Sequence, residues 1–346
     1  MSARANYQAA VSSTRRHASS SGPPIDYREL IRLGSLAASS HNTQPWTFTP
    51  ENGRIRIEPD YSRRCPVVDP DDAHLFRSLG CAAENIVHAA AAIGLRADID
   101  INAATTVPDV TIHLVADPDC RATDLADAIT SRQCTKAPYD GHPIDQDHLA
   151  ALAPAEPRYG VRTIVLTDTA AMQAIVALVE RGNRAQLTDP AFRDELLSWI
   201  RPNDHESLAS GDGLSGRTMG SPSIPTWLAK RLLPLLVTAK RQVKTDTANI
   251  ASSAGIAVFV TDGNNVSDWV NAGRCYERFA LQATVLDICN AFINQPIEVP
   301  SLRPELEQYL GLGDEHAQLM VRFGTGTQMP FSPRRPLDDI INTASA

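Results

Sequence analysis

One stretch of the chain gathers polar side chains in an order that suggests recognition of a flat polar ligand. It reads Ser39-Ser40-His41-Asn42-Thr43-Gln44-Pro45-Trp46, after a helix-like segment and before a strand-like one. Two adjacent hydroxyls and two amides, held by a rigid Pro-Trp corner, offer both donors and acceptors. This combination suits the polar edge of a planar heterocycle. The alternative is structural, with Ser and Asn satisfying backbone groups at a helix C-terminus and Trp46 in the core.

A second stretch carries positive charge. In Ser131-Arg132-Gln133-Cys134-Thr135-Lys136-Ala137-Pro138-Tyr139, Arg132 and Lys136 stand four residues apart, and on a helix this spacing places both on one face. Two cations on one face attract an anion, and the guanidinium fork of arginine suits a dianionic phosphate. The alternative is a solvated basic helix end.

Together the two stretches resemble the motifs of the FMN-dependent nitroreductase superfamily, in particular its Acg-type branch, in which one chain imitates the usual homodimer. The resemblance covers nearly the whole chain. It implies a nitroreductase-like α+β fold, FMN as the cofactor and NAD(P)H as a possible co-substrate. The residues that would bind the cofactor are Ser39, Ser40, Asn42, Gln44, Arg132, Gln133, Cys134, Lys136, Arg334 and Arg335.

The resemblance also implies a division of roles. In the family the two motifs come from opposite subunits, so here they would come from opposite halves of one chain. Lys136 beside the flavin N1 and O2 would stabilise the anionic reduced form, and Arg334 and Arg335 resemble a segment that closes over the phosphate. No side chain is an obvious general acid, so FMN itself would carry the chemistry. Cys134 stands where the family usually has Ser, and a thiol is the poorer donor.

Two pairs of echoes indicate that the chain contains two copies of one half. Pro24-Ile25-Asp26 returns 119 residues later as Pro143-Ile144-Asp145. Gly80-Cys81-Ala82-Ala83-Glu84-Asn85 returns 193 residues later as Gly273-Arg274-Cys275-Tyr276-Glu277-Arg278. The second copy therefore holds about 74 additional residues, which we place at roughly 176–249. Within them, 201–225 is dense in Gly, Ser and Pro, which favours a lid over a linker.

The duplication also predicts the number of cofactor sites. A symmetric dimer has two sites, and the second would need the first-half Arg15-Arg16-His17, which lacks an equivalent of Lys136. It would also need a second-half copy of the polar motif, but residues 158–165, at the 119-residue offset, keep none of it. We therefore expect one FMN per chain, in a monomeric pseudo-dimer or weak oligomer.

Strand-like runs rich in β-branched residues alternate with helical patterns, which indicates two α+β halves. We expect a flexible or partly helical segment over 1–24, a first half over 25–120 and a second half over 121–346. Asn52-Gly53 predicts a hairpin turn, and 189–200 has the apolar spacing of an amphipathic helix. The expected strands cover 54–58, 111–116, 163–167, 256–261 and 319–323.

Composition limits the partners. The 346 residues carry 32 Lys and Arg against 40 Asp and Glu, a net charge of −8 that argues against a nucleic-acid surface. No apolar run approaches the roughly 18 to 20 residues that span a bilayer, and six cysteines without a Cys-x-x-Cys pair fit reduced thiols in the cytoplasm. The acidic cluster Asp69, Asp71 and Asp72 with His74 is more simply a solvated loop than a cation site.

Two functions stay open. The first is an oxidoreductase that takes electrons from NAD(P)H and passes them to a small nitroaromatic or quinone-type acceptor. The second is an FMN storage or sequestration protein, whose lidded flavin has little or no turnover.

Overall fold

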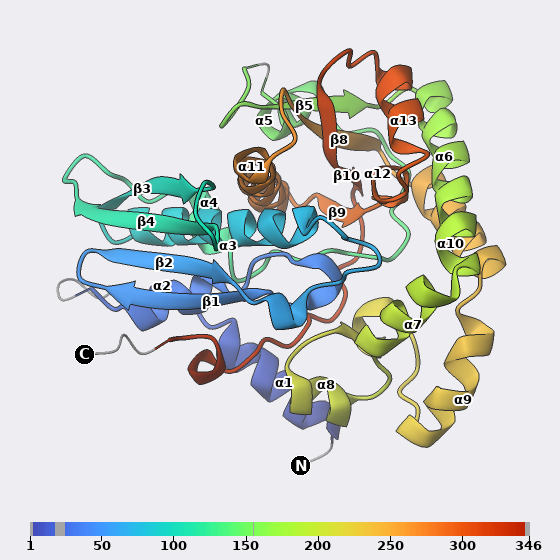
Figure 1. Ribbon diagram of the computed structural model, residues 1–346, viewed down its shortest axis with the longest axis horizontal. Helices are drawn as coiled ribbons and strands as arrows, with labels where there is room; N and C mark the ends of the chain where they lie inside the picture. The colour runs from blue at the N-terminus through green and yellow to red at the C-terminus, as the bar shows by residue number, and fades with distance from the viewer. Residues whose placement is uncertain (1–2, 18–24, 155, 343–346) are drawn as a thin grey trace.

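Two four-stranded antiparallel sheets with the same strand order form the framework of the two halves (Figure 1). The computed structural model describes residues 3–17, 25–154 and 156–342. The first sheet has the order β1-β2-β4-β3 and the second β5-β8-β10-β9, so each reads first, second, fourth, third. The strands are β1 (Trp46–Glu51), β2 (Arg54–Pro59), β3 (Leu95–Asn102), β4 (Asp109–Ala116), β5 (Val161–Leu166), β8 (Gly255–Thr261), β9 (Cys289–Phe292) and β10 (His316–Gly324). The repeated order confirms the duplicated α+β fold.

A long helix joins the second strand of each sheet to the third, and the two helices cross at the centre of the molecule. They are α3 (Ala73–Ala91) and α11 (Val266–Val285). A Cβ on Gly80 would lie 2.0 Å from the Val270 carbonyl oxygen, and a Cβ on Gly273 would lie 1.9 Å from that of Arg77. Because no side chain fits there, the two glycines of the sequence echo allow the helix backbones to touch.

We expect Gly273→Ala to lower the free energy of unfolding by about 3 kcal/mol, since the new methyl group forces the helices apart in a packed core. Denaturant unfolding measures this change. Val87→Ala, at a half-buried position of α3, is the control and should cost roughly 1 kcal/mol. A Gly273→Ala protein as stable as the control would contradict the close helix contact.

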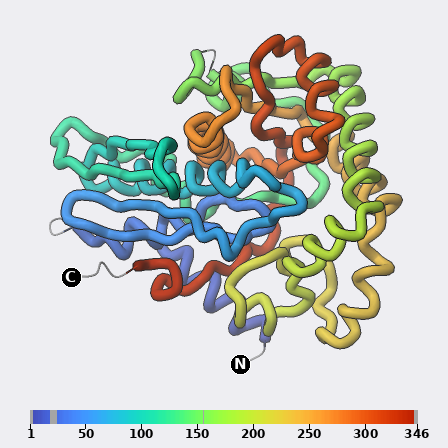
Figure 2. Tube along the Cα trace, in the orientation of Figure 1, coloured from blue at the N-terminus to red at the C-terminus, as the bar shows by residue number. Residues whose placement is uncertain are grey.

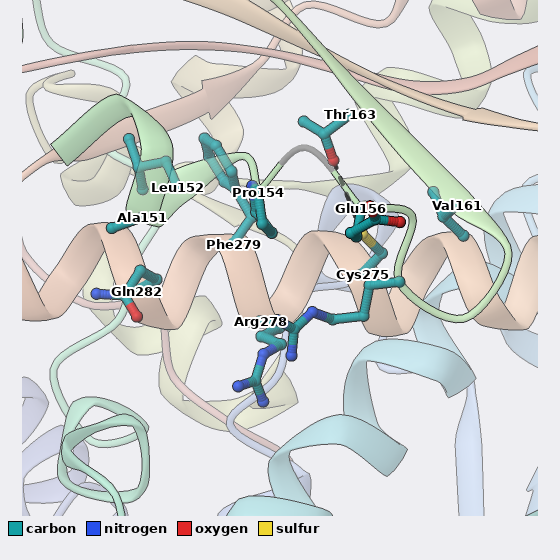
Figure 3. A pocket seen from close by; sticks show the side chains of 11 residues that line it. Ala151, Leu152, Pro154, Glu156, Val161, Thr163, Cys275, Arg278, Phe279 and Gln282 are labelled. Atoms are coloured by element: carbon teal, nitrogen blue, oxygen red, sulfur yellow. Dashed lines mark hydrogen bonds between the residues drawn. The ribbon is translucent and has the colours of Figure 1, made fainter. Parts of the chain in front are cut away.

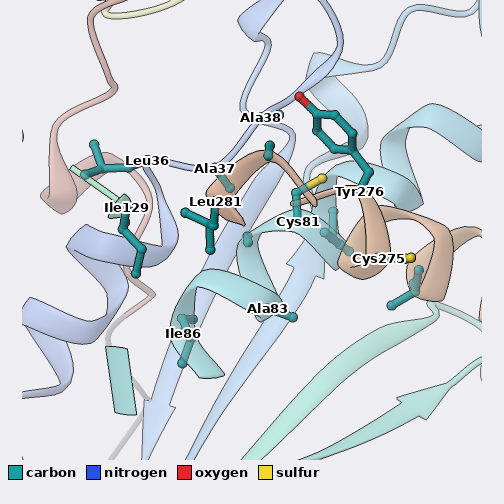
Figure 4. Close-up of a cluster of buried hydrophobic side chains, with 14 of the residues drawn as sticks. Leu36, Ala37, Ala38, Cys81, Ala83, Ile86, Ile129, Cys275, Tyr276 and Leu281 are labelled. Atoms are coloured by element: carbon teal, nitrogen blue, oxygen red, sulfur yellow. The ribbon is translucent and has the colours of Figure 1, made fainter. Parts of the chain in front are cut away.

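The hydrophobic core is continuous across the two halves. Figure 4 shows Leu36, Ala37 and Ala38, which follow α2 (Tyr27–Gly34), among buried side chains of α3 and α11. Asp26 caps α2 by accepting from the Glu29 amide, and Asp145 caps α5 (Gln146–Leu152) by accepting from the His148 amide. Pro24 of that echo lies outside the described residues. The core thus fixes the point at which the polar motif begins.

An inserted helical segment distinguishes the second half from the first. In the first half Asn52-Gly53 alone joins β1 to β2, whereas residues 167–254 lie between β5 and β8. Figure 2 shows this segment passing down one side of the molecule from the second half towards the N-terminal helix. It contains α6 (Thr169–Thr188), α7 (Pro190–Trp199), α8 (Asp204–Ser210), α9 (Thr226–Leu236), α10 (Ala239–Ala251) and the short pair β6 (Ile200–Arg201) and β7 (Leu214–Ser215).

The remaining elements bring both ends of the chain to the first half. The N-terminal helix α1 (Ala3–Thr14) packs against α8 and buries Tyr7 and Val11. At the other end, the Phe48 amide donates to the Ile340 carbonyl at 2.7 Å, so the C-terminal segment lies along β1. The other helices are α4 (Asp124–Ala128), α12 (Gln295–Glu298) and α13 (Arg303–Leu310). Within the described ranges, no helix has the length and apolar character needed to cross a membrane.

Candidate cofactor site

The polar motif forms a strained turn between α2 and β1. His41, Asn42 and Gln44 have φ values of 49°, 55° and 52°, a left-handed conformation that costs non-glycine residues of order 1 kcal/mol each. The Ser39 hydroxyl closes the turn by accepting from the Gln44 amide at 3.1 Å. Trp46 is fully buried, as the structural alternative expected. Because strain of this kind persists only where its surroundings impose it, the turn depends on the groups that hold it.

Those groups are the insertion and the C-terminal segment. The Asn42 amide donates to the Gly213 carbonyl at 3.2 Å, and its oxygen accepts from Arg334. The Gln44 amide donates to the Gly211 carbonyl at 2.8 Å, and its oxygen accepts from the Arg335 backbone. These two amides therefore clamp three segments together, whereas the Ser40 side chain makes no hydrogen bond to any described residue.

The predicted helix over the basic motif is wrong. Helix α4 ends at Ala128, and the following chain runs extended beside β9, with the Thr135 amide donating to the Asn290 carbonyl at 2.8 Å. The open edge of β9 offers these backbone bonds, and Pro138 disfavours helix at the preceding residue. Arg132 and Lys136 therefore do not share a helix face.

Arg132 lies in the interior, paired with a carboxylate from α11. Its Nε is 2.8 Å from Glu277 Oε1, and both side chains are at most 2% exposed. Burial alone would lower the pKa of Arg132, but the Glu277 carboxylate raises it above its ordinary range, so the guanidinium stays charged. Arg334 lies close by, because both arginines donate to the Leu36 carbonyl. Burial and the charge of Arg132 lower the pKa of Arg334 to about 10.

Arg15 joins the same cluster, although we had assigned it to the second site. Its guanidinium donates to the carbonyls of Thr130 and Arg132 at 2.9 and 3.1 Å and lies 4.1 Å from the centre of the Phe331 ring. Helix α1 carries it there. Sequence reasoning missed this placement because no local pattern indicates where α1 docks.

Lys136 has a different environment. Its side chain is exposed, and its ammonium forms no hydrogen bond or ion pair within the described part of the chain. Buried Arg322 of β10 donates to the carbonyls of Thr135 and Ala137 and so fixes the backbone on both sides of the lysine. Arg322 is the second residue that the sequence analysis missed. Its position between apolar residues of β10 could have indicated it.

The other predicted residues position the backbone. The Gln133 side chain donates to the Met329 carbonyl and accepts from its amide, at 2.9 and 2.8 Å. Cys134 Sγ lies 3.5 Å from the Tyr276 hydroxyl. Arg335 points away from Arg132, since its guanidinium donates to the carbonyls of Gln44 and Trp46.

The charges of this cluster fit an anionic group. Within the described structure, Arg15, Arg132 and Arg334 face one carboxylate, that of Glu277, which leaves two uncompensated positive charges. The Nε of Arg15 is buried and has no hydrogen-bond partner in the described structure. A phosphate monoester carries a charge of about −1.5 to −2 at neutral pH, which would balance the two positive charges, and its oxygens can accept a hydrogen bond from the Arg15 Nε. The residues present therefore fit a phosphate-bearing cofactor.

The counterpart of Glu277 in the first half is already satisfied by the protein. Glu84 occupies the same place in the sequence echo and is fully buried. It accepts from the Tyr159 hydroxyl at 2.8 Å and pairs with Arg274 Nε at 3.2 Å and His88 Nε2 at 3.3 Å. Arg274 in turn lies 3.7 Å from the centre of the Tyr159 ring. Arg274 and Tyr159 thus take the position beside Glu84 that Arg132 takes beside Glu277.

Two hollows lie outside this cluster. The first, in Figure 3, is bounded by the end of α5, by β5 and by Cys275, Arg278, Phe279 and Gln282 of α11. The second lies where the start of α3 meets α12 and α13, and includes Asp69, His74 and Glu298. No predicted cofactor residue lines either hollow. In the second, Asp69 accepts from the amides of His74 and Leu75, so it caps α3. No group of three or more His, Cys, Asp or Glu among the described residues could hold a metal ion.

Glu298 makes stability depend on pH. Burial, together with the Asp69 carboxylate, raises its pKa from 4.5 to about 7. Between these values the folded chain holds a proton that the unfolded chain releases, so the contribution of this group falls as pH rises from about 4.5 to 7. We expect Glu298→Gln to gain roughly 1–3 kcal/mol over wild type at pH 8 and nothing at pH 4.5, measured by denaturant unfolding. Exposed Glu305→Gln is the control, and an equal difference at both pH values would contradict the assignment.

Comparison with known proteins gives sequence relatives that cover 91% of the chain. No family model matches the sequence. The protein named "Putative NAD(P)H nitroreductase Rv3131", from Mycobacterium tuberculosis, is 24% identical over 328 residues, which cover 91% of this chain and 90% of the relative. The protein named "Putative NAD(P)H nitroreductase acg", from the same organism, is 22% identical over 341 residues, with 91% and 95% covered. A solved structure of the FMN-dependent nitroreductase NfnB from Mycobacterium smegmatis, in complex with NADPH, is 11% identical, with a TM-score of 0.40 over 64% of this chain and 98% of that one.

Proposed function

We propose that the chain is a member of the nitroreductase superfamily with relatives of the Acg type, that it binds one FMN and that it acts as an NAD(P)H-dependent oxidoreductase. The observation that carries the proposal is the buried arginine cluster, whose surplus positive charge suits the FMN phosphate. A small nitroaromatic or quinone-type molecule would be the electron acceptor.

Each group of residues has a distinct part in this proposal. Arg132 would bind the phosphate and Arg334 would add positive charge beside it. Lys136, which pairs with no described residue, would face the electron-rich N1 and O2 edge of the ring. Ser39 and Ser40 begin the turn beside them, while Asn42, Gln44, Gln133 and Cys134 fix the surrounding backbone. FMN, when bound, supplies the two-electron chemistry that no side chain here provides.

The environment of Glu84 supports one cofactor per chain. In the first half this carboxylate is neutralised by Arg274 and bonded to Tyr159. Arg15, which the second site would have needed, lies instead beside Arg132 and Arg334. The second site would therefore lack an uncommitted cation.

A storage function is the second candidate, and the docking of the insertion favours it. Gly211 and Gly213 bond to the polar motif, and a Cβ on Gly211 would lie 2.7 Å from the carbonyl oxygen of Arg334 in the C-terminal segment. Asp212 between them pairs with Arg63 of the first half. An insertion held this firmly would cover a bound flavin and slow its reaction with a nucleotide.

Lys136→Ala tests the proposed site. Loss of the ammonium should weaken FMN binding about tenfold and lower the flavin potential by on the order of 30 mV, because an anionic reduced flavin loses its cation. Fluorescence titration and a redox titration against a reference dye measure the two effects. The control is Lys240→Ala, on the exposed part of α10. Unchanged affinity and potential in Lys136→Ala would place the flavin elsewhere.

A further inference from the structure

We propose that Arg15 is a third phosphate-binding cation, delivered by the N-terminal helix, so that the site combines arginines from both copies of the duplicated basic segment. This inference rests on the proposed FMN function. It assigns a binding role to a residue of the first half that belongs, by the logic of the duplication, to the site that the chain has lost.

The surplus positive charge of the cluster supports a phosphate-binding role for Arg15. With Arg132 and Arg334 alone, the Glu277 carboxylate would leave one surplus positive charge, which is less than a phosphate monoester carries. Arg15 raises the surplus to two. The three guanidiniums interact electrostatically, since burial and then the charges of Arg334 and Arg132 lower the pKa of Arg15. Like charges held together at this cost indicate a place for a counter-anion.

The guanidinium of Arg15 also keeps hydrogen-bond donors that a phosphate could use. All three nitrogens of the Arg334 guanidinium already donate to carbonyls or to Asn42. Arg132 forms an ion pair with Glu277 through Nε, and its Nη2 donates to the Leu36 carbonyl. Among the described residues, Arg15 donates only through Nη1, to main-chain carbonyls, and its buried Nε has no hydrogen-bond partner. It therefore keeps more donor capacity than Arg334, which has none left.

Neighbouring groups fix Arg15 in place. Its guanidinium stacks on Phe331, and the Tyr7 hydroxyl of the same helix donates to the Phe331 carbonyl at 2.8 Å. Tyr7 also bonds to Ser215 in the insertion. Helix α1 is thus anchored to both the C-terminal segment and the insertion, and it presents Arg15 in a fixed orientation that lowers the entropic cost of binding.

The test compares two ligands that differ only in the phosphate. We expect Arg15→Ala to weaken FMN binding by about 10- to 100-fold and to leave the affinity for riboflavin unchanged, in fluorescence titrations of the full chain. The neighbouring Arg16→Ala is the matched control, because Arg16 is 54% exposed on its side chain and pairs with Glu29. It should leave both affinities unchanged. Arg15→Gln, which removes the charge but keeps a polar side chain, replaces Arg15→Ala if that variant does not fold.

Each outcome has a separate meaning. Equal loss of FMN and riboflavin affinity in the Arg15 variants would show a merely structural role and overturn the inference. Unchanged FMN affinity would overturn it as well. If the wild-type chain binds neither ligand, the proposed function itself fails.

Discussion

Replacing Arg132 by leucine should lower the free energy of unfolding by about 3–5 kcal/mol and weaken FMN binding by at least 100-fold. The stability loss arises because Glu277, which is fully buried, would keep a carboxylate without its closest counter-charge. The affinity loss arises because a charge-assisted phosphate contact disappears at the same time. Denaturant unfolding and FMN titration measure the two effects separately.

A double variant distinguishes these two roles. In Arg132→Leu/Glu277→Gln the uncompensated charge is gone, while the amide oxygen can still accept from the Ala38 backbone as the carboxylate does. Most of the stability should return, but the affinity for FMN should recover only in part, because the surplus of two positive charges is restored whereas the contact from Arg132 to the phosphate is not. Full recovery of FMN affinity in the double variant would show that Arg132 serves the fold alone.

Asp212→Asn should speed both FMN release and reduction of bound flavin by NAD(P)H by about tenfold or more. Asp212 is 5% exposed and pairs with Arg63, which follows β2, and with Arg201 of the insertion, at 2.7 Å for the latter. The carboxylate therefore ties the insertion to the first half beside the polar motif, where Arg63 also donates to the Thr43 carbonyl. Stopped-flow absorbance under anaerobic conditions measures the reduction.

Asp204→Asn is the matched control for the Asp212 ion pairs. Asp204 is equally buried and pairs with Arg217, but both residues belong to the insertion, so no ion pair between the insertion and the first half is lost. It should leave both rates near those of wild type. If Asp212→Asn is as slow as this control, the insertion does not limit access to the flavin, and the storage function loses its support.

The architecture was largely predictable because it rests on patterns that repeat. The echoes around Gly80 and Gly273 mark a helix crossing that tolerates no side chain, and Asp26 and Asp145 cap equivalent helices. The five expected strands are β2, β4, β5, β8 and β10. Of the two four-stranded sheets, β1, β3 and β9 were not among them. For β1 the sequence indicated only a strand-like segment before the Asn52-Gly53 turn, β3 alternates with charged residues, and β9 spans only four residues.

The site was less predictable because tertiary contacts decide it. Charge spacing suggested a helix for 131–139, but pairing with β9 determined its conformation. Asn42 and Gln44 have the right chemistry for a ligand, yet the insertion and the C-terminal segment use their polar atoms. Arg15 could be placed only once the docking of α1 was known, since its role depends on residues more than 100 positions away.

The measurement that tests the central claim most directly is the absorbance spectrum of the full chain saturated with FMN and freed of excess, followed by anaerobic addition of NADH or NADPH. We predict one flavin per chain, bleached by at least one of the two nucleotides in proportion to the protein present. Two flavins per chain, or none, would contradict the single cluster around Arg132, and one bound flavin that neither nucleotide reduces would contradict the oxidoreductase function in favour of storage.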